Sequence, residues 1–222
     1  SGVHSGRAWK PDMTVRVLLV DDHAVVREGY RRLLERTADI EVVAEAAGSE
    51  AAYRLFRETA PDVVVMDLTL PGVSGVETTR RIISREPAAR VLVFSVHEDI
   101  VFASRALQAG ARGYITKSSA PELMVEAVRA VAAGRPYLSH DIAQKLAMHR
   151  LPGQPLPFDD LSPREFEVFR LFAEGKSIAD VARILSLSAK TIANYQSLIK
   201  QKLEADTSAQ MVWIALRHGL LE

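Results

Sequence analysis

The sequence predicts a doubly wound α/β domain with a (βα)5 parallel sheet, followed by a smaller all-α domain that contains a helix-turn-helix. Two patterns predict this architecture. Short runs of β-branched residues alternate with longer amphipathic segments as far as Gly134, and every periodic segment beyond a proline-bearing stretch has helical spacing. The length of 222 residues exceeds that of a typical single domain, which also favours two domains.

The composition excludes several other classes of protein. The chain has 28 Lys or Arg, 28 Asp or Glu and 48% hydrophobic residues, which is typical of a globular protein and not of a disordered or collagen-like one. Because the sequence has no cysteine, disulfides, a thiol nucleophile and a zinc ribbon are excluded, and we expect a cytoplasmic protein. No apolar run approaches the roughly 18 residues of a membrane span. Residues Ser1–Asp12 are polar and aperiodic, lack the apolar core of a signal peptide and are left out of the predicted fold.

Five strands are expected, each a short run rich in β-branched residues: Val15–Val20, Glu41–Ala46, Asp62–Asp67, Arg90–Val96 and Arg112–Thr116. The first, third and fourth are continuously apolar, which is typical of parallel strands covered on both faces. The amphipathic segments that follow the strands predict right-handed crossover helices and a last helix. These helices are expected at His23–Arg36, Ser49–Thr59, Gly75–Arg85, Asp99–Ala109 and Ala120–Ala133.

A linker is expected where this pattern stops. It contains a short helix near Ser139–His149 and then LPGQPLPF (Leu151–Phe158), whose prolines and glycine prevent regular pairing. Beyond it, Ser or Thr followed three residues later by an acid or amide marks three helix starts. Four helices are predicted: Pro163–Ala173, Ile178–Leu185, Ala189–Leu203 and Ser208–His218. The predicted divisions are therefore residues 14–134, 135–158 and 159–222.

Three carboxylates lie at the ends of predicted neighbouring strands. Asp21 and Asp22 follow the first strand, and Asp67 ends the third. Because three anions in one crevice repel one another, we expect a cation there, and oxygen ligands favour a hard ion such as Mg²⁺. The fourth strand adds the hydroxyl of Ser95 and the fifth adds the ammonium of Lys117. This set suits a phosphoryl group transferred to a carboxylate, and Asp67 is the predicted nucleophile.

Two other interpretations of these carboxylates stay open at this point. An aspartate at a strand end can simply cap the next helix, and each of the three taken singly is equally compatible with that role. A phosphatase of the haloacid-dehalogenase type also forms an aspartyl-phosphate. Such an enzyme needs a second acid two positions after the nucleophile, where this chain has Thr69, so we expect no enzyme of this type.

The four sequence segments VLLVDDHAVVREGYRRLL, DVVVMDLTLPGVSGVE, VLVFSVHED and GARGYITKS together resemble the receiver domain of two-component response regulators. The resemblance covers about Thr14–Gly134 and implies the flavodoxin-like form of the doubly wound fold. It implies that a sensor histidine kinase phosphorylates Asp67 and that Ser95, Tyr114 and Lys117 respond to the phosphate. The Mg²⁺ ligands that it implies are Asp22 directly, Asp21 mostly through water, Asp67 and the backbone carbonyl of Thr69.

The segment Ser177–Leu203 has the spacing of a helix-turn-helix, because only Ser186 and Leu187 separate its two helices. Residues 159–222 carry a net charge of −1, but residues 176–202 carry +4, which is a usable footprint for phosphates. One face of the second helix is polar and could equally be solvated. It contains Lys190, Ala193, Asn194, Ser197 and Gln201.

The segment LSPREFEVFRLFAEGKSIADVARILSLSAKTIANYQSLIKQKL, with ALRHGL after it, resembles the C-terminal domain of NarL/FixJ-type regulators, the LuxR-type helix-turn-helix. The resemblance implies that Ala189–Leu203 enters the major groove of promoter DNA and that Ser208–His218 supplies a contact in a homodimer. RNA polymerase is a further candidate partner. The implied DNA contacts are Lys190, Thr191, Ala193, Asn194, Ser197, Lys200, Gln201 and Lys202.

Two different regulators remain as alternatives to a transcriptional response regulator. A ligand-sensing LuxR-type regulator would not need the acids at the strand ends. A receiver that acts through protein contacts alone would not bind promoter DNA. The sequence leaves the cognate kinase, the target promoters and the choice between activation and repression open.

Overall fold

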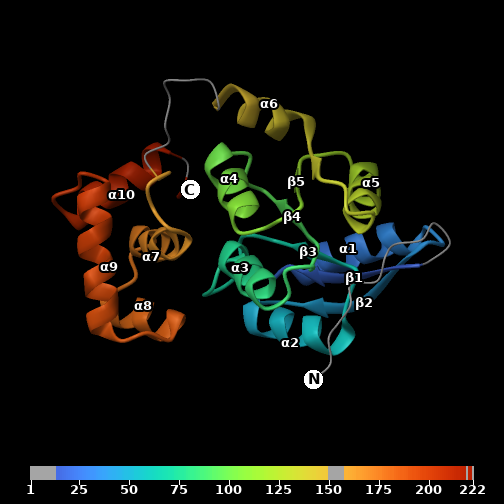
Figure 1. Ribbon diagram of the computed structural model, residues 1–222, viewed down its shortest axis with the longest axis horizontal. Coiled ribbons are helices and arrows are strands. Elements are labelled where there is room, and N and C mark those ends of the chain that lie inside the picture. Colours follow the sequence, from blue (N-terminus) through green and yellow to red (C-terminus); the bar gives the residue numbers. More distant parts are fainter. Residues whose placement is uncertain (1–13, 150–157, 219, 222) are drawn as a thin grey trace. The chain divides into compact units, whose positions relative to one another are not determined.

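A six-stranded parallel sheet organises the N-terminal part of the protein (Figure 1). The computed structural model describes residues 14–149, 158–218 and 220–221, which divide into two compact units between Met148 and His149. The strands pair in the order β2-β1-β3-β4-β5-β6. Their bounds are β1 (Val15–Val20), β2 (Ile40–Ala46), β3 (Val63–Met66), β4 (Val91–Ser95), β5 (Gly113–Thr116) and β6 (Tyr137–Leu138).

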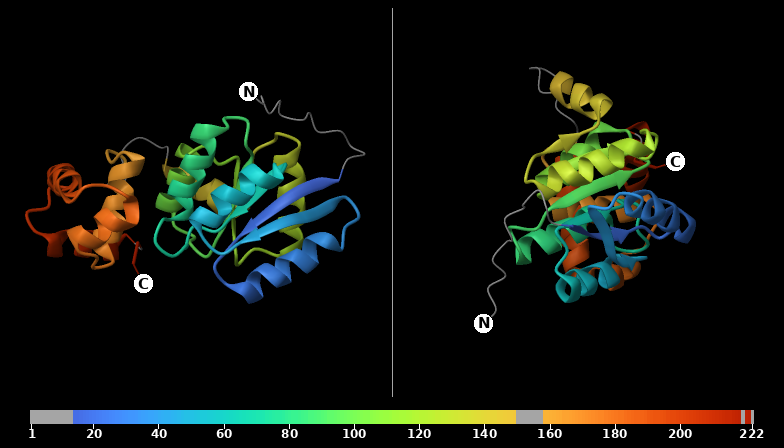
Figure 2. Two further views of the ribbon diagram at one scale, coloured as in Figure 1. Left: turned by 90° about the horizontal axis from the view of Figure 1, so that it is seen from below. Right: turned by 90° about the vertical axis from the view of Figure 1, so that its right-hand side faces the viewer.

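Helices cover both faces of this sheet, as Figure 2 shows. Successive side chains of a strand point to opposite faces, so β1 contributes to two core layers. Val17 packs in one layer with Leu34 and Val128, and Leu18 packs in the other with Ile82. The helices of this unit are α1 (Ala24–Glu35), α2 (Ser49–Thr59), α3 (Gly75–Arg85), α4 (Ile100–Gln108), α5 (Pro121–Ala132) and α6 (His140–His149).

The predicted parallel α/β fold is confirmed, and the strand order explains where a site can form. The chain passes from β1 to β2 on one side and then to β3 on the other side of β1. Such a reversal leaves a crevice beyond the carboxyl ends of the two central strands. The backbone at the start of α3 packs directly against the backbone of Asp67, because a Cβ on Gly75 would lie 1.9 Å from the Asp67 carbonyl oxygen. Only glycine fits at the start of α3.

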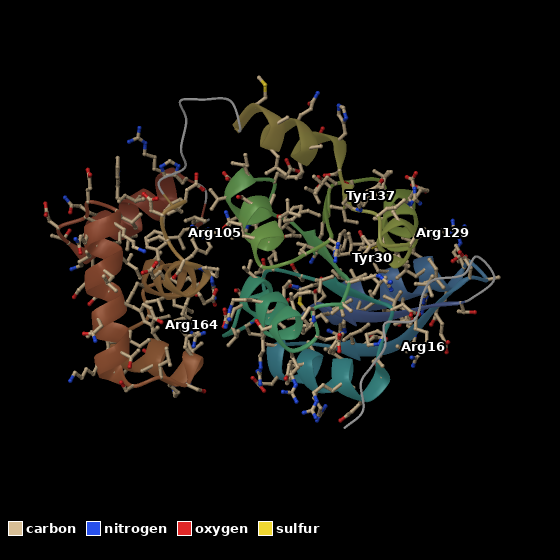
Figure 3. All side chains as sticks on the ribbon, viewed as in Figure 1. Arg16, Tyr30, Arg105, Arg129, Tyr137 and Arg164 are labelled. Carbon is tan, nitrogen blue, oxygen red and sulfur yellow. The ribbon has the colours of Figure 1, made fainter. Side chains whose placement is uncertain are left out.

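The sheet has one strand more than the five expected from the sequence. The two residues of β6 pair with β5, and the Tyr137 N–H donates to the Arg112 carbonyl at 3.2 Å. Tyr137, labelled in Figure 3, also donates its hydroxyl to Glu126 of α5 at 3.3 Å. A Cβ on Gly113 would meet the Tyr137 carbonyl at 2.7 Å, so this glycine lets β6 approach. Two residues are too few for a recognisable strand pattern, which is why the sequence did not predict β6.

The second unit consists of helices around an aromatic core. Phe158, Phe166 and Phe169 are buried and pack against one another, and Ile192 and Ile199 close the core from another helix. A Ser or Thr side chain caps the start of every helix of this unit over the described residues. The bounds are α7 (Pro163–Ala173), α8 (Ile178–Leu185), α9 (Ala189–Lys202) and α10 (Ser208–Arg217).

Three residues, 186–188, lie between α8 and α9, one more than the two expected from the sequence. Ser186 adopts a left-handed conformation with φ 53°, and the Leu187 N–H donates to the Ala182 carbonyl at 2.9 Å. These contacts end α8 and start α9 within three residues. The proline-bearing residues 151–157 of the predicted linker lie outside the described part of the chain. Among the residues that are described, none of the helices combines the length and apolar character needed to cross a membrane.

Candidate phosphorylation site and nucleic-acid interface

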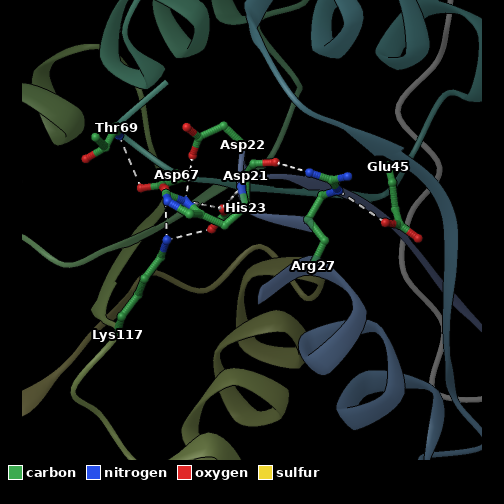
Figure 4. A network of polar contacts seen from close by, with 8 residues as sticks. All are labelled: Asp21, Asp22, His23, Arg27, Glu45, Asp67, Thr69 and Lys117. Carbon is green, nitrogen blue, oxygen red and sulfur yellow. Dashed lines mark hydrogen bonds and ion pairs between the residues drawn. The ribbon is translucent and has the colours of Figure 1, made fainter. Parts of the chain in front are cut away.

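The carboxylates predicted from the strand ends do converge (Figure 4). Asp21 and Asp22 lie in the turn after β1, and Asp67 directly follows β3. One ligand atom each from Asp21, Asp22, His23 and Asp67 lies within 4.8 Å of all the others. Asp21 and Asp67 are buried, with 5% and 2% of their surface exposed, whereas Asp22 and His23 are exposed. The cluster therefore has a buried floor and an open rim.

Backbone hydrogen bonds hold both acidic turns in place. The Asp67 N–H continues the ladder by donating to the Val20 carbonyl at 2.8 Å, which puts the two strand ends side by side. Asp21 Oδ1 accepts the His23 N–H at 2.8 Å, and Asp67 Oδ1 accepts the Thr69 N–H at 3.2 Å. Each carboxylate is thus fixed by the second residue after it in the chain.

Lys117 joins the two buried carboxylates. Its Nζ lies 2.5 Å from Asp21 Oδ2 and 2.8 Å from Asp67 Oδ2. Although burial lowers the pKa of Lys117, its hydrogen bonds to Asp21 and Asp67 raise that pKa above its usual value, so the ammonium stays charged. Burial, opposed by Lys117, raises the pKa of the Asp67 carboxyl. The cluster therefore combines carboxylate oxygens with one fixed cation.

Ser95 is the last residue of β4, Tyr114 is the second residue of β5, and both are fully buried. The Tyr114 hydroxyl donates to the His97 carbonyl at 2.8 Å, and the His97 N–H donates to Ser95 Oγ at 3.2 Å. Burial raises the pKa of the Tyr114 hydroxyl, which keeps the phenol neutral. The two predicted switch residues are thus linked through one residue of the loop after β4.

Sequence reasoning missed two histidines of this site. His23 Nδ1 lies 2.8 Å from Asp22 Oδ1, and only its place directly after the acids could have signalled this. His97 is half-buried. Its ring stacks on Phe102, and its Nε2 lies 3.1 Å from Thr69 Oγ1. No sequence pattern announces that contact, because it joins two loops that only the fold brings together.

The outer face of α9 carries most of the residues predicted to contact DNA. Lys190, Asn194, Ser197 and Gln201 are exposed, and Thr191, Ala193 and Lys200 are half-buried beside them. Leu198, which the sequence reasoning did not include, is 45% exposed on this helix. The opposite face buries Ile192 and Ile199 in the core.

Lys202 has a different environment from the other predicted contacts. Its Nζ lies 2.7 Å from Glu165 Oε2 and donates to the Asp160 carbonyl at 3.0 Å. It therefore ties the end of α9 to the start of α7. Its role as a DNA contact remains a prediction. On α10, the helix predicted to contact a second copy, Trp213 and Leu216 are 58% and 52% exposed, and the Arg217 guanidinium lies 5.2 Å from the Trp213 ring centroid.

Comparisons with known proteins match a known family to each of the two units. Residues 17–129 match the response regulator receiver domain, and residues 159–215 match the luxR family of bacterial regulatory proteins. The chain belongs to the LuxR-type response regulators. The acidic cluster is therefore the acidic pocket of a receiver domain, and α8 and α9 form the helix-turn-helix of a DNA-binding transcription regulator.

Related sequences align with nearly the whole length of this response regulator. The transcriptional activator protein ExaE of Pseudomonas putida is 41% identical over 208 residues, which are 92% of this chain and 97% of ExaE. The response regulator UvrY of Escherichia coli K12 is 37% identical over 93% of this chain and 95% of its own.

Solved structures of response regulators also resemble it. RcsB of Salmonella enterica serovar Typhimurium, bound to the promoter rprA in the presence of the phosphomimetic BeF3⁻, is 25% identical over 90% of this chain and 98% of its own, with a TM-score of 0.72. A LuxR-family two-component response regulator from Aurantimonas sp. SI85-9A1 is 56% identical over 62% of this chain and 99% of its own, with a TM-score of 0.61.

Proposed function

We propose that this response regulator accepts a phosphoryl group on Asp67 from a sensor histidine kinase, and that the phosphorylated chain dimerises and binds promoter DNA through α9. The observation that carries the proposal is the convergence of Asp21, Asp67 and Lys117, with Lys117 Nζ within 2.8 Å of both carboxylates. A cap for the next helix would not need a half-buried lysine between two buried acids. A phosphoryl group needs this combination of nucleophile and cation.

The donor set of the cluster fits Mg²⁺. Asp21, Asp22 and Asp67 supply carboxylate oxygens within one ion's reach, and oxygen-rich sites suit hard divalent cations. We propose the Thr69 carbonyl as a further ligand. When bound, Mg²⁺ would neutralise negative charge on the phosphoryl oxygens.

The residues of the chain perform the rest of the transfer. A carboxylate oxygen of Asp67 forms a bond to phosphorus while the bond between phosphorus and the donor's histidine nitrogen breaks, so the imidazole leaves with the electron pair. Burial makes the Asp67 oxygens more basic by raising the carboxyl pKa, and Lys117 keeps the reactive ionised form. Lys117 then pairs with an oxygen of the bound phosphoryl group.

We propose that Ser95 and Tyr114 report the new phosphate. Ser95 would turn its hydroxyl toward a phosphoryl oxygen, and Tyr114 would change rotamer with it. The shared contacts of both residues with His97 support this coupling, because movement of either one changes the loop that follows β4.

The helix-turn-helix would then bind DNA as part of a dimer. The exposed residues of α9 support a groove-facing helix, and exposed Trp213 and Leu216 support α10 as a contact between two copies. RNA polymerase is the further partner that we propose for a promoter-bound dimer. Since the proposed target is promoter DNA, the proposed place of action is the bacterial cytoplasm.

Intact-mass spectrometry after incubation with acetyl phosphate and Mg²⁺ tests the phosphorylation site. We expect one added phosphoryl group on the wild type and none on Asp67→Asn. Asp62→Asn is the matched control, because Asp62 precedes the other end of β3 and its Oδ2 accepts the Arg16 N–H at 2.9 Å, away from the cluster. This control should be labelled like the wild type. A labelled Asp67→Asn variant would contradict the assignment.

A further inference from the structure

Arg27, which lies outside the predicted site, contacts the turn that carries Asp21 and Asp22. Arg27 lies on α1, one turn after the cluster, and its side chain is only 17% exposed. Its Nη1 donates to the Asp21 carbonyl at 2.6 Å, and its Nε donates to Glu45 Oε2 at 3.3 Å (Figure 4). Arg27 thus connects the acidic turn to β2.

This contact completes the fixation of Asp21. The Asp21 N–H donates to the Ala46 carbonyl at 3.1 Å, Oδ1 accepts the His23 N–H, and Oδ2 pairs with Lys117. The carbonyl oxygen is the remaining polar group, and Arg27 occupies it with a charged donor. Hydrogen bonds from charged donors are the stronger ones, so this contact restrains the peptide that joins Asp21 to Asp22.

We infer that Arg27 is a positioning residue for divalent-cation binding, which rests on the proposed function of the cluster. Arg27 contacts none of the carboxylates of the cluster and would not touch the ion; it acts through the backbone of Asp21. Cation ligands must converge within narrow distances, so a turn that is already fixed binds with less loss of entropy than a loose one.

The positive charge of Arg27 would have the opposite effect on cation binding. The direction in which the affinity changes when Arg27 is removed therefore distinguishes positioning from repulsion. A lone guanidinium near the cluster would repel a divalent cation, and its removal would tighten binding. Glu45 offsets that charge by pairing with Arg27, and Arg31, which also donates to Glu45 at 2.7 Å, has a second carboxylate partner in Glu35 at 3.3 Å. The positioning effect should therefore exceed the repulsion.

Titration of the full chain with Mn²⁺ alone, followed by electron paramagnetic resonance of the free ion, tests this inference. We expect Arg27→Ala to weaken Mn²⁺ binding about tenfold, equal to about 1.4 kcal/mol. Arg27→Lys keeps the charge but offers a single donor nitrogen, and should restore part of that loss. Arg31→Ala is the matched control, because Arg31 shares Glu45 but has no hydrogen bond to Asp21, and it should bind Mn²⁺ like the wild type.

Circular dichroism and thermal unfolding of the same samples separate loss of positioning from loss of fold. Should Arg27→Ala unfold, the comparison of Arg27→Lys with the wild type carries the test, and about threefold weaker binding is expected. Unchanged or tighter Mn²⁺ binding in a folded Arg27 variant would overturn the inference and leave the metal site standing. A wild-type chain that binds no Mn²⁺ would overturn both.

Discussion

Two lysines of α9 illustrate how ion pairing divides the residues of one helix between DNA binding and stability. Lys190 is exposed, and the described residues offer it no ion pair, whereas Lys202 is paired with Glu165 and the Asp160 carbonyl. A free ammonium can release a counterion from DNA at little cost. A paired ammonium must first give up its protein contacts.

We therefore predict different effects of alanine at these two positions. Lys190→Ala should weaken binding to specific and random DNA alike and flatten the salt dependence by about one unit, without changing stability. Lys202→Ala should instead lower the free energy of unfolding of the C-terminal domain by about 1 kcal/mol. Fluorescence anisotropy over a range of salt concentrations, together with urea unfolding, separates the two effects. If Lys202→Ala flattened the salt slope as much as Lys190→Ala, both lysines would contact phosphates.

Residues whose role depends on topology could be predicted, and residues whose role depends on a rotamer could not. The convergence of Asp21, Asp67 and Lys117 follows from strand order alone, because parallel strands end at one edge. The contacts of Arg27 and His97 depend on where long or loop-borne side chains point after folding. Neither spacing nor composition encodes that direction.

At the scale of elements, a capping box makes the start of α7 sensitive to acid. Glu165 accepts the Ser162 N–H at 2.7 Å and pairs with Lys202. Although burial raises the pKa of Glu165, these hydrogen bonds hold it below its usual value. A lowered pKa in the folded state means that the stabilisation is fully present above the unfolded pKa of about 4.3 and is lost as the pH falls through the folded value.

Replacing this acid should therefore remove part of the acid sensitivity. We predict that Glu165→Gln lowers the free energy of unfolding at pH 7, and that its difference from the wild type shrinks between about pH 5 and pH 3. Urea unfolding at these pH values measures both. A difference that stays constant with pH would show that the Glu165 charge contributes nothing to stability.

The segment that follows α5 is the element that the sequence described least well. Residues 135–148 were expected to form part of a linker, but β6 pairs with β5 and Ile142 of α6 is fully buried. Lys145 donates to the Glu98 carbonyl at 2.7 Å, and Ser118 donates to the Glu98 carboxylate at 2.6 Å. The segment is thus attached to the loop that follows β4, which is itself hydrogen-bonded to the loop that follows β5.

Two receiver fragments test how much this segment contributes. A fragment that ends at Gly134 should unfold at a lower urea concentration than one that ends at His149. The free energy of unfolding should fall by about 3 kcal/mol, mainly because the apolar surface that Ile142 covers becomes exposed. Ile142→Ala in the longer fragment should reproduce most of that loss. Equal stability of the two fragments would support the boundary predicted at residue 134.

Helix bounds were easier to predict than this segment, because local chemistry specifies them. Ser162 and Pro163 start α7, and Ser177 starts α8, at the residues where caps are expected. In contrast, β6 is defined by its partner strand and by the missing side chain of Gly113, which are facts of tertiary structure.

At the scale of the whole molecule, a phosphate on the first unit must change DNA binding by the second. The two units are separately compact and are joined by residues 150–157. Two mechanisms can connect them: the receiver can restrain α9 until Asp67 is phosphorylated, or phosphorylation can act only by driving dimerisation. Moving a two-state equilibrium from 1:99 to 99:1 requires about 5.5 kcal/mol, which a doubly charged group with a bound cation can supply.

We predict that restraint and dimerisation both operate, and the fragment of residues 149–222, which keeps the buried core residue Phe158, distinguishes them. On one promoter fragment with paired half-sites, this fragment should bind more tightly than the unphosphorylated full chain, because it lacks the restraining receiver. The phosphorylated full chain should bind most tightly, since a dimer engages both half-sites at once. Analytical ultracentrifugation should show a dimer only with acetyl phosphate and Mg²⁺, and Asp67→Asn should stay monomeric. If the unphosphorylated full chain bound at least as tightly as the fragment, restraint would be excluded, and dimerisation alone would connect Asp67 to α9.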